Sequence, residues 1–150
     1  MDWVGGVVPA AVGAGSALLT QFGERLVGRF FERRARQEQL RDADLIELEK
    51  AIFEVRDLAT SYWPFPSGNP MLEGAIVGRM TFLSELAEEL FASKSELLWN
   101  LQVAINAFDT ACTGGEFGSP GRAADPGRCR DVEITAYRLV RLAKESRRKL

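Results

Sequence analysis

The side chains best suited to chemistry in this sequence are three neighbouring glutamates, Glu85, Glu88 and Glu89. On a helix, Glu85 and Glu88 share a face, and paired carboxylates are the usual beginning of a metal site or of an acid and base pair. Di-metal sites in helical bundles also need a Glu-x-x-His partner, and the apolar stripe of this segment runs through Leu83 and Leu86 instead. We therefore expect a solvated acidic face here.

The chain contains no histidine, which removes most of the chemistry that carboxylates could support. Histidine is the commonest general base and a frequent zinc ligand, so neither a Ser-His-Asp triad nor a standard structural zinc site can be assembled. The two cysteines, Cys112 and Cys129, are too few to hold zinc alone. The sequence predicts no catalytic residue, no metal and no cofactor, and hence a protein that is not an enzyme.

A glycine-rich stretch from Thr113 to Arg128 carries Arg122 and Arg128, and Arg130 follows it. Arginines beside glycine backbone can bind a phosphate or a partner. Because no Walker-type lysine is present and no strand precedes the stretch, the pattern favours a disordered or mobile connector. A ligand or partner loop that uses the three arginines is the alternative.

Helical periodicity dominates the chain after about residue 40, and no strand-like alternation of useful length appears. Four segments carry apolar residues at spacings of three and four, with charged residues on other faces. The expected inward positions are Leu45, Leu48, Ile52, Val55, Ala59 and Tyr62; Leu72, Ile76, Met80, Leu83, Leu86 and Leu90; Leu97, Leu98, Leu101, Ala104, Ile105 and Phe108; and Val132, Ala136, Leu139, Val140 and Ala143. The sequence predicts an all-α fold, a four-helix bundle over residues 41–150 preceded by an N-terminal fifth helix.

The breaks between these helices follow from local signals. The stretch "WPFPSGNP" from Trp63 to Pro70 ends the first bundle helix. We expect Tyr62, Trp63 and Phe65 to close the end of the bundle, and an exposed contact point for a partner is the alternative. Ser93 or Ser95 is the predicted N-cap of the third helix, and Asp131 that of the last.

The segment from Trp3 to Gly23 has no charged residue, and as a helix it would be about 31 Å long, which matches the hydrocarbon core of a bilayer. Trp3 and Phe22 lie near its two edges, as interfacial aromatic residues do. Arginines then recur from Arg25 to Arg41, and the positive-inside rule keeps such a flank in the cytoplasm. We predict a span of the bacterial inner membrane, Val4 to Phe22, with the N-terminus outside. The bundle and its reduced cysteines then lie in the cytoplasm.

The same segment is diluted by glycine, so a lone helix of this composition would insert only marginally. Small residues let transmembrane helices pack closely. We therefore predict that the helix forms a homo-oligomer in the lipid bilayer. The surface expected to mediate this contact consists of Gly13, Ala14, Gly15, Ala17 and Phe22.

Two other interpretations of the segment stay open. As a buried helix of a soluble cytoplasmic protein it would carry many glycines, each of which costs about 1 kcal/mol relative to alanine. As a cleaved signal peptide it would need a basic beginning, whereas Asp2 is acidic.

The overall charge gives no reason to expect a nucleic acid or nucleotide partner. The chain has 19 basic and 21 acidic residues and a net charge of −2. Acidic residues interleave with the arginines from Arg25 to Arg41, which favours pairing along a solvated helix.

The layout of a weakly apolar N-terminal span, an arginine-rich neck and a small helical bundle resembles membrane-anchored proteins of bacterial anti-phage and CRISPR systems. It is similar to the accessory membrane pore protein of type VI CRISPR systems in architecture, without a shared motif. The resemblance implies a HEPN-like bundle that assembles into a ring-shaped pore and acts in antiviral defence. The HEPN ribonuclease signature requires a histidine, so no nuclease residue carries over.

These features predict two domains, residues 1–40 with the transmembrane helix and its neck, and residues 41–150 with the bundle. The expected function is that of a non-enzymatic, single-pass membrane protein that self-assembles and forms a pore or otherwise perturbs the membrane. The alternative is a soluble, all-helical adaptor or inhibitor that binds a protein partner.

Overall fold

The computed structural model describes the backbone of residues 10–150 and the side chains of residues 35, 36 and 38–150. Its four elements are all α-helices: α1 (Ala10–Tyr62), α2 (Pro70–Phe91), α3 (Ser95–Thr113) and α4 (Pro126–Arg147). No strand occurs in this described part. The chain divides into two units, Met1–Leu40 and Arg41–Leu150.

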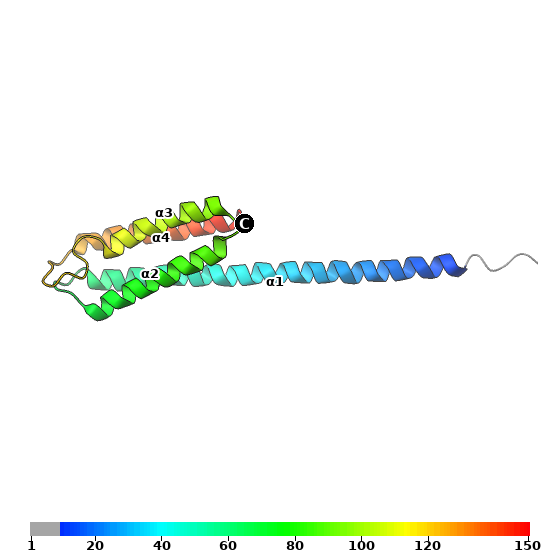
Figure 1. The fold of residues 1–150 in the computed structure, drawn as a ribbon, viewed down its shortest axis with the longest axis horizontal. Coiled ribbons are helices and arrows are strands. Elements are labelled where there is room, and N and C mark those ends of the chain that lie inside the picture. The colour runs from blue at the N-terminus through cyan, green and yellow to red at the C-terminus, as the bar shows by residue number, and fades with distance from the viewer. Residues whose placement is uncertain (1–9) are drawn as a thin grey trace, which may run out of the picture. The chain divides into compact units, whose positions relative to one another are not determined.

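Four helical segments of the second unit form an all-α bundle, as the sequence predicts. α3 packs against both α2 and α4. Ion pairs of Glu54 with Arg79 (3.0 Å) and of Glu49 with Lys144 (2.9 Å) link α1 to α2 and to α4. Because successive helices are antiparallel, α2 and α4 both begin beside the connecting loops and run toward the end where the C-terminus lies (Figure 1).

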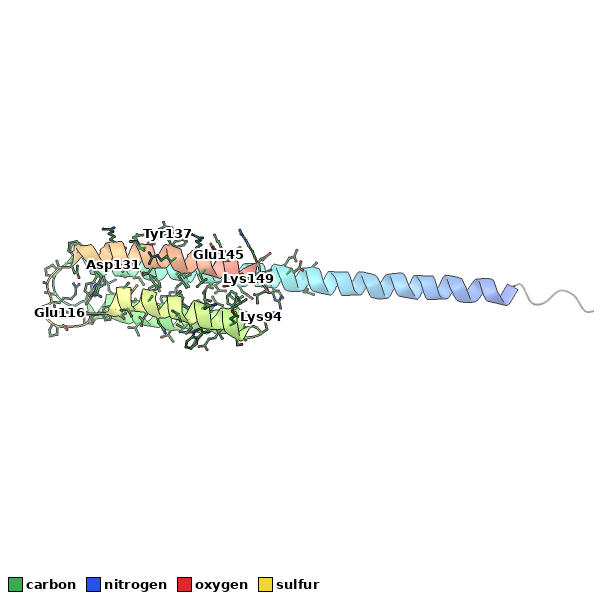
Figure 2. All side chains as sticks on the ribbon, turned by 90° about the horizontal axis from the view of Figure 1, so that it is seen from above. Lys94, Glu116, Asp131, Tyr137, Glu145 and Lys149 are labelled. Atoms are coloured by element: carbon green, nitrogen blue, oxygen red, sulfur yellow. The ribbon has the colours of Figure 1, made fainter. Side chains whose placement is uncertain are left out.

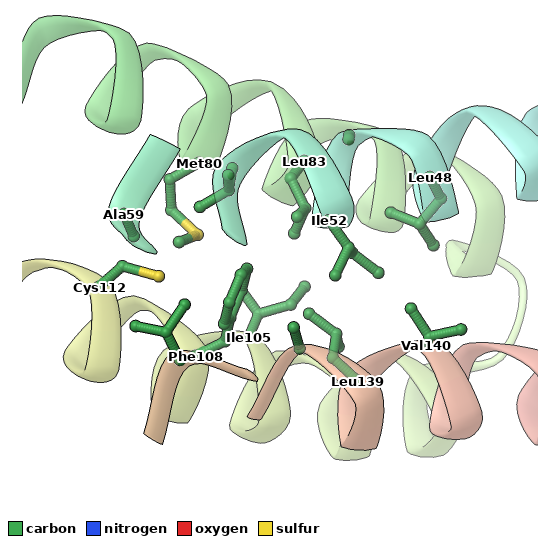
Figure 3. Close-up of a cluster of buried hydrophobic side chains, with 14 of the residues drawn as sticks. Leu48, Ile52, Ala59, Met80, Leu83, Ile105, Phe108, Cys112, Leu139 and Val140 are labelled. Carbon is green, nitrogen blue, oxygen red and sulfur yellow. The ribbon is translucent and has the colours of Figure 1, made fainter. Parts of the chain in front are cut away.

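Each helix buries one stripe of apolar side chains, and the stripes meet in a single core (Figure 3). Fully buried members include Leu48, Ile52, Val55 and Ala59 of α1; Ile76, Met80, Leu83, Ala87 and Phe91 of α2; Leu101, Ile105, Phe108 and Cys112 of α3; and Val132, Ala136, Leu139, Val140 and Ala143 of α4. The predicted stripes are confirmed for most positions, and the predicted residues Leu45, Leu72, Leu97, Leu98 and Ala104 are partly buried against the core. The stripe itself shifts only in the second half of α2. There Ala87 and Phe91 are buried, while Leu86 and Leu90 are only partly covered, because the buried face drifts around a helix of 3.6 residues per turn.

Two predicted helix starts are wrong. α3 begins at Ser95 without a side-chain cap, so neither Ser93 nor Ser95 serves as one. α4 begins at Pro126, and Asp131 lies inside it. The actual cap is Asp125, whose carboxylate accepts a hydrogen bond from the Arg128 amide at 3.2 Å. An acidic cap followed by proline is a strong start, since proline at the first helical position has no N–H to leave unpaired.

The predicted separate N-terminal helix and the first bundle helix are one element, α1. No proline or turn signal interrupts the sequence between them, and glutamate, leucine, arginine and alanine favour helix throughout. The described side chains of residues 35–43 are exposed, and the first fully buried one is Leu48.

The predicted membrane span starts at Val4 and so begins outside the described residues. For its later part, which includes Gly13, Ala14, Gly15, Ala17 and Phe22, the structure describes a helical backbone only. Within the described part of the chain, no helix combines the length and the apolar character needed to cross a membrane.

A chain that begins at Arg41 is expected to fold on its own, because the described core starts at Leu48 and is shared among the four bundle segments. Circular dichroism of this truncated chain should give a cooperative thermal transition. A molten, aggregating product would show instead that residues 1–40 supply part of the core.

Candidate functional site

Tyr62 and Trp63 close the loop end of the bundle, as the sequence predicts, whereas Phe65, expected to join them, is 67% exposed. Tyr62 and Trp63 are each only 2% exposed and meet edge to face with ring centroids 5.2 Å apart. The Trp63 indole donates a hydrogen bond to the Cys112 carbonyl oxygen at 2.9 Å. This bond satisfies the one polar atom of the buried indole and joins the end of α1 to the end of α3.

Arg122, from the glycine-rich connection, covers these two rings. Its side chain is 3% exposed, and its guanidinium carbon lies 3.9 Å from the Tyr62 ring centroid and 4.8 Å from that of Trp63. Nη2 donates to the Tyr62 carbonyl oxygen at 2.7 Å, and Nη1 donates to that of Ala123 at 3.2 Å. The charge is therefore held by two carbonyl groups and two aromatic faces, an arrangement that suits the flat guanidinium group.

The Tyr62 hydroxyl joins the same connection to the start of α2. It donates to Glu73 Oε1 at 2.8 Å and accepts a hydrogen bond from the Gly118 amide at 3.1 Å. The Glu73 oxygen also accepts from the Asn69 amide at 3.0 Å. One buried phenol thus connects three parts of the chain.

Backbone hydrogen bonds also join the α3–α4 connection to the end of α1 and the α1–α2 connection. Ser67 N–H donates to the Arg122 carbonyl oxygen at 2.9 Å, and Asp125 N–H donates to that of Trp63 at 2.8 Å. Gly115 adopts a positive φ of 67°, and a side chain there would meet the Arg128 guanidinium at 2.7 Å. The prediction of a disordered or mobile connector is therefore wrong, because the connection packs against the end of the core.

The structure brings two of the three predicted ligand arginines, Arg122 and Arg128, to the Trp63 ring, and the third, Arg130, does not join them. Arg122 is buried, whereas Arg128 is half-buried, lies 4.4 Å from the Trp63 ring centroid and pairs with Asp125 at 3.5 Å. Arg130 is exposed on α4. Sequence reasoning missed the structural use of Arg122, because its partners Tyr62 and Trp63 lie some sixty positions earlier in the chain.

The acidic residues Glu85, Glu88 and Glu89 are all exposed on α2, so the predicted solvated face is confirmed. Over the described residues, no group of three His, Cys, Asp or Glu side chains is placed to hold a metal ion.

The two cysteines are free thiols. Burial is the main cause that raises the pKa of Cys112 to about 12, and Asp109 adds to the effect. Burial also raises the pKa of the half-buried Cys129, whose sulfur lies 3.7 Å from the Thr60 carbonyl oxygen. Neither thiol has the depressed pKa of a reactive nucleophile.

The remaining candidate surfaces are apolar. A groove of about 820 Å³ runs between α1 and α2 over Leu58, Leu72 and Phe82, beside Gly74 and Gly78.

On α3, Trp99 is 70% exposed and Val103 is 53% exposed, one turn apart on a face without charge between them. Exposed tryptophan is enriched at protein interfaces.

Comparison with known proteins gives no relative. No protein family, no curated protein and no solved structure matches the chain.

Replacing Arg122 with alanine should lower the free energy of unfolding by about 1 to 3 kcal/mol, since it exposes two aromatic faces and leaves buried carbonyl groups without a donor. Arg130→Ala is the matched control and should change it by less than about 0.5 kcal/mol. Urea unfolding of the two variants measures both values. Equal effects would contradict a structural role for Arg122.

Thiol labelling should separate the two cysteines. At pH 8 the Cys112 thiol stays protonated because its pKa is about 12, so iodoacetamide should modify Cys129 first. In urea, where the ordinary pKa returns, both should react at similar rates. Mass spectrometry of the labelled peptides gives the rates, and rapid modification of Cys112 in the folded chain would refute the described packing.

Proposed function

We propose that this chain is a non-enzymatic, membrane-anchored protein that self-assembles. The observation that carries the proposal is that the hydrophobic core of the bundle is formed by residues from Leu48 onward. The described core draws on residues from Leu48 onward, while the described side chains of residues 35–43 face solvent. The bundle thus has a complete interior without a contribution from residues 35–43.

The sequence of the first unit supports insertion into a membrane. The uncharged stretch from Trp3 to Gly23 has the length of a bilayer span, and the arginines from Arg25 onward suit a cytoplasmic flank beside anionic headgroups. Its small residues suit close packing between copies. The absence of histidine supports a role without catalysis.

Fractionation of the untagged chain tests the anchor. After a carbonate wash, the full chain should remain in the membrane pellet, whereas the chain that begins at Arg41 should appear in the soluble fraction. Recovery of the full chain in the soluble fraction would overturn the proposal.

The concrete form of the assembly that we propose is a pore. Replacing Gly13 and Gly15 with leucine should reduce dye release from loaded vesicles, since the larger side chains hold neighbouring helices apart. Val7→Leu with Val8→Leu is the matched control and should leave release unchanged. Full release by the glycine variant, or none by the unmodified chain, would contradict the pore.

A second candidate function, a soluble adaptor, is favoured by the exposed Trp99 and Val103 on α3. Such a face fits an apolar partner surface, and tryptophan often supplies a large share of binding energy. The same fractionation separates the candidates, since an adaptor would stay in the soluble fraction.

A further inference from the structure

The outward face of α2 changes character along its length. Its first half exposes Gly74, Val77 and Gly78, and a side-chain carbon built at either glycine would have no neighbour within 4 Å. Its second half exposes Glu85, Glu88 and Glu89, and none of these three forms an ion pair with another described residue. Like charges at spacings of three and four repel each other on a helix. The negative charge of this face is therefore not neutralised by an ion pair within the described bundle.

The outward face of α4 has the matching pattern. Around its middle it exposes Ile134 (37%) and Tyr137 (56%), after the exposed Arg130 and Asp131. Its second half exposes Arg138, Arg141 and Lys144, again at spacings of three, followed by Arg148. Figure 2 shows Asp131, Tyr137 and Glu145 distributed along this helix.

Some of these cations have acidic neighbours within the chain. Arg141 pairs with Glu145 at 2.8 Å, and Lys144 pairs with Glu49 at 2.9 Å. Both cations nevertheless stay at least half exposed, with side-chain exposures of 80% and 51%. They are therefore accessible to a second carboxylate.

The two faces lie on different helices that are not adjacent in the bundle. α3 packs against both α2 and α4, and these two helices are not neighbours of each other. Both are 22 residues long and start at the same end of the bundle (Figure 1). Counted from Pro70 and Pro126, Gly78 is level with Ile134, Thr81 with Tyr137, Glu85 with Arg141, and Glu88 with Lys144.

We propose that the α4 face of one copy docks on the α2 face of a second copy in the same orientation. Ile134 and Tyr137 then lie over the space beside Gly74 and Gly78, and the basic half of α4 meets the acidic half of α2. Each copy uses its α4 face for one neighbour and its α2 face for another, so further copies can be added. A closed ring forms if successive rotations between neighbouring copies add up to a full turn. The inference rests on the proposed function and deepens it, because a rotation about an axis parallel to the bundle gives every bundle the same orientation, as anchoring in one membrane requires.

Cysteine cross-linking of the full chain tests the register. In a Cys129→Ser background, Thr81→Cys together with Tyr137→Cys should give a ladder of covalent oligomers with a short bismaleimide. The control pair is Thr81→Cys with Gly127→Cys, whose positions are offset by about 15 Å along the helix axis. It should give no ladder. A ladder from the control that equals that of the matched pair would overturn the register.

Charge reversal tests the forces. In the matched cysteine pair, Glu85→Lys with Glu88→Lys should reduce the ladder about tenfold or more, and so should Arg141→Glu with Lys144→Glu, because like charges then face each other. Combining all four substitutions should restore the ladder, since the charges are exchanged between the faces. Circular dichroism confirms that each variant is folded. An undiminished ladder in either reversed variant, or no rescue in the folded exchange variant, would refute the interface.

Failure of this interface and failure of the membrane anchor give different results. A ladder formed by chain recovered in the soluble fraction would uphold the interface and refute the anchor. Chain that stays in carbonate-washed membranes without forming a ladder would uphold the anchor and refute the interface.

Discussion

The bundle depends on one constraint, that four helices must each bury a single apolar stripe in a common interior. Ile52, Leu83, Ile105 and Leu139 occupy that interior, one from each helix, and all are at most 2% exposed. Removing one such stripe would expose the other three to water. The stability of each helix therefore comes mainly from packing against the other three. The constraint also decides what stays outside, because the faces turned away from the core carry the charges and the exposed aromatic residues.

The loop end of the bundle shows how a buried charge is accommodated. The connection from α3 to α4 packs against the C-terminal end of α1, where backbone carbonyl groups need donors. Arg122 supplies them from a flat side chain that also covers Tyr62 and Trp63. The residues that looked most like a ligand loop therefore include one whose task is to complete the fold.

Much of this fold follows from the sequence, because helical periodicity is a strong signal when it persists over several turns. The stripe through Leu48, Ile52 and Val55 is an example that the structure confirms. Local cap signals are less reliable, because Asp125 and Asp131 are both acceptable caps by residue type and α4 begins after the first of them. The role of Arg122 depends on a contact with residues some sixty positions earlier, and no local pattern encodes it.

Periodicity also predicts which charged residues face outward. How the charged faces of different helices are placed relative to one another becomes clear only from the topology. The sequence shows glutamates in α2 and arginines in α4, but only the antiparallel bundle sets them at matching levels on helices that are not adjacent. A chain with complementary faces on opposite helices can join copies in series, and a common orientation of the copies fits anchoring in one membrane.

Hydrogen exchange of the full chain with and without lipid vesicles tests the central claim, that the bundle is complete by itself and the first unit belongs to the membrane. The account predicts that vesicles protect the amides from Val4 to Phe22 and leave those of the bundle core unchanged. Strong protection of Val4 to Phe22 in the absence of lipid, unchanged when vesicles are added, would contradict it.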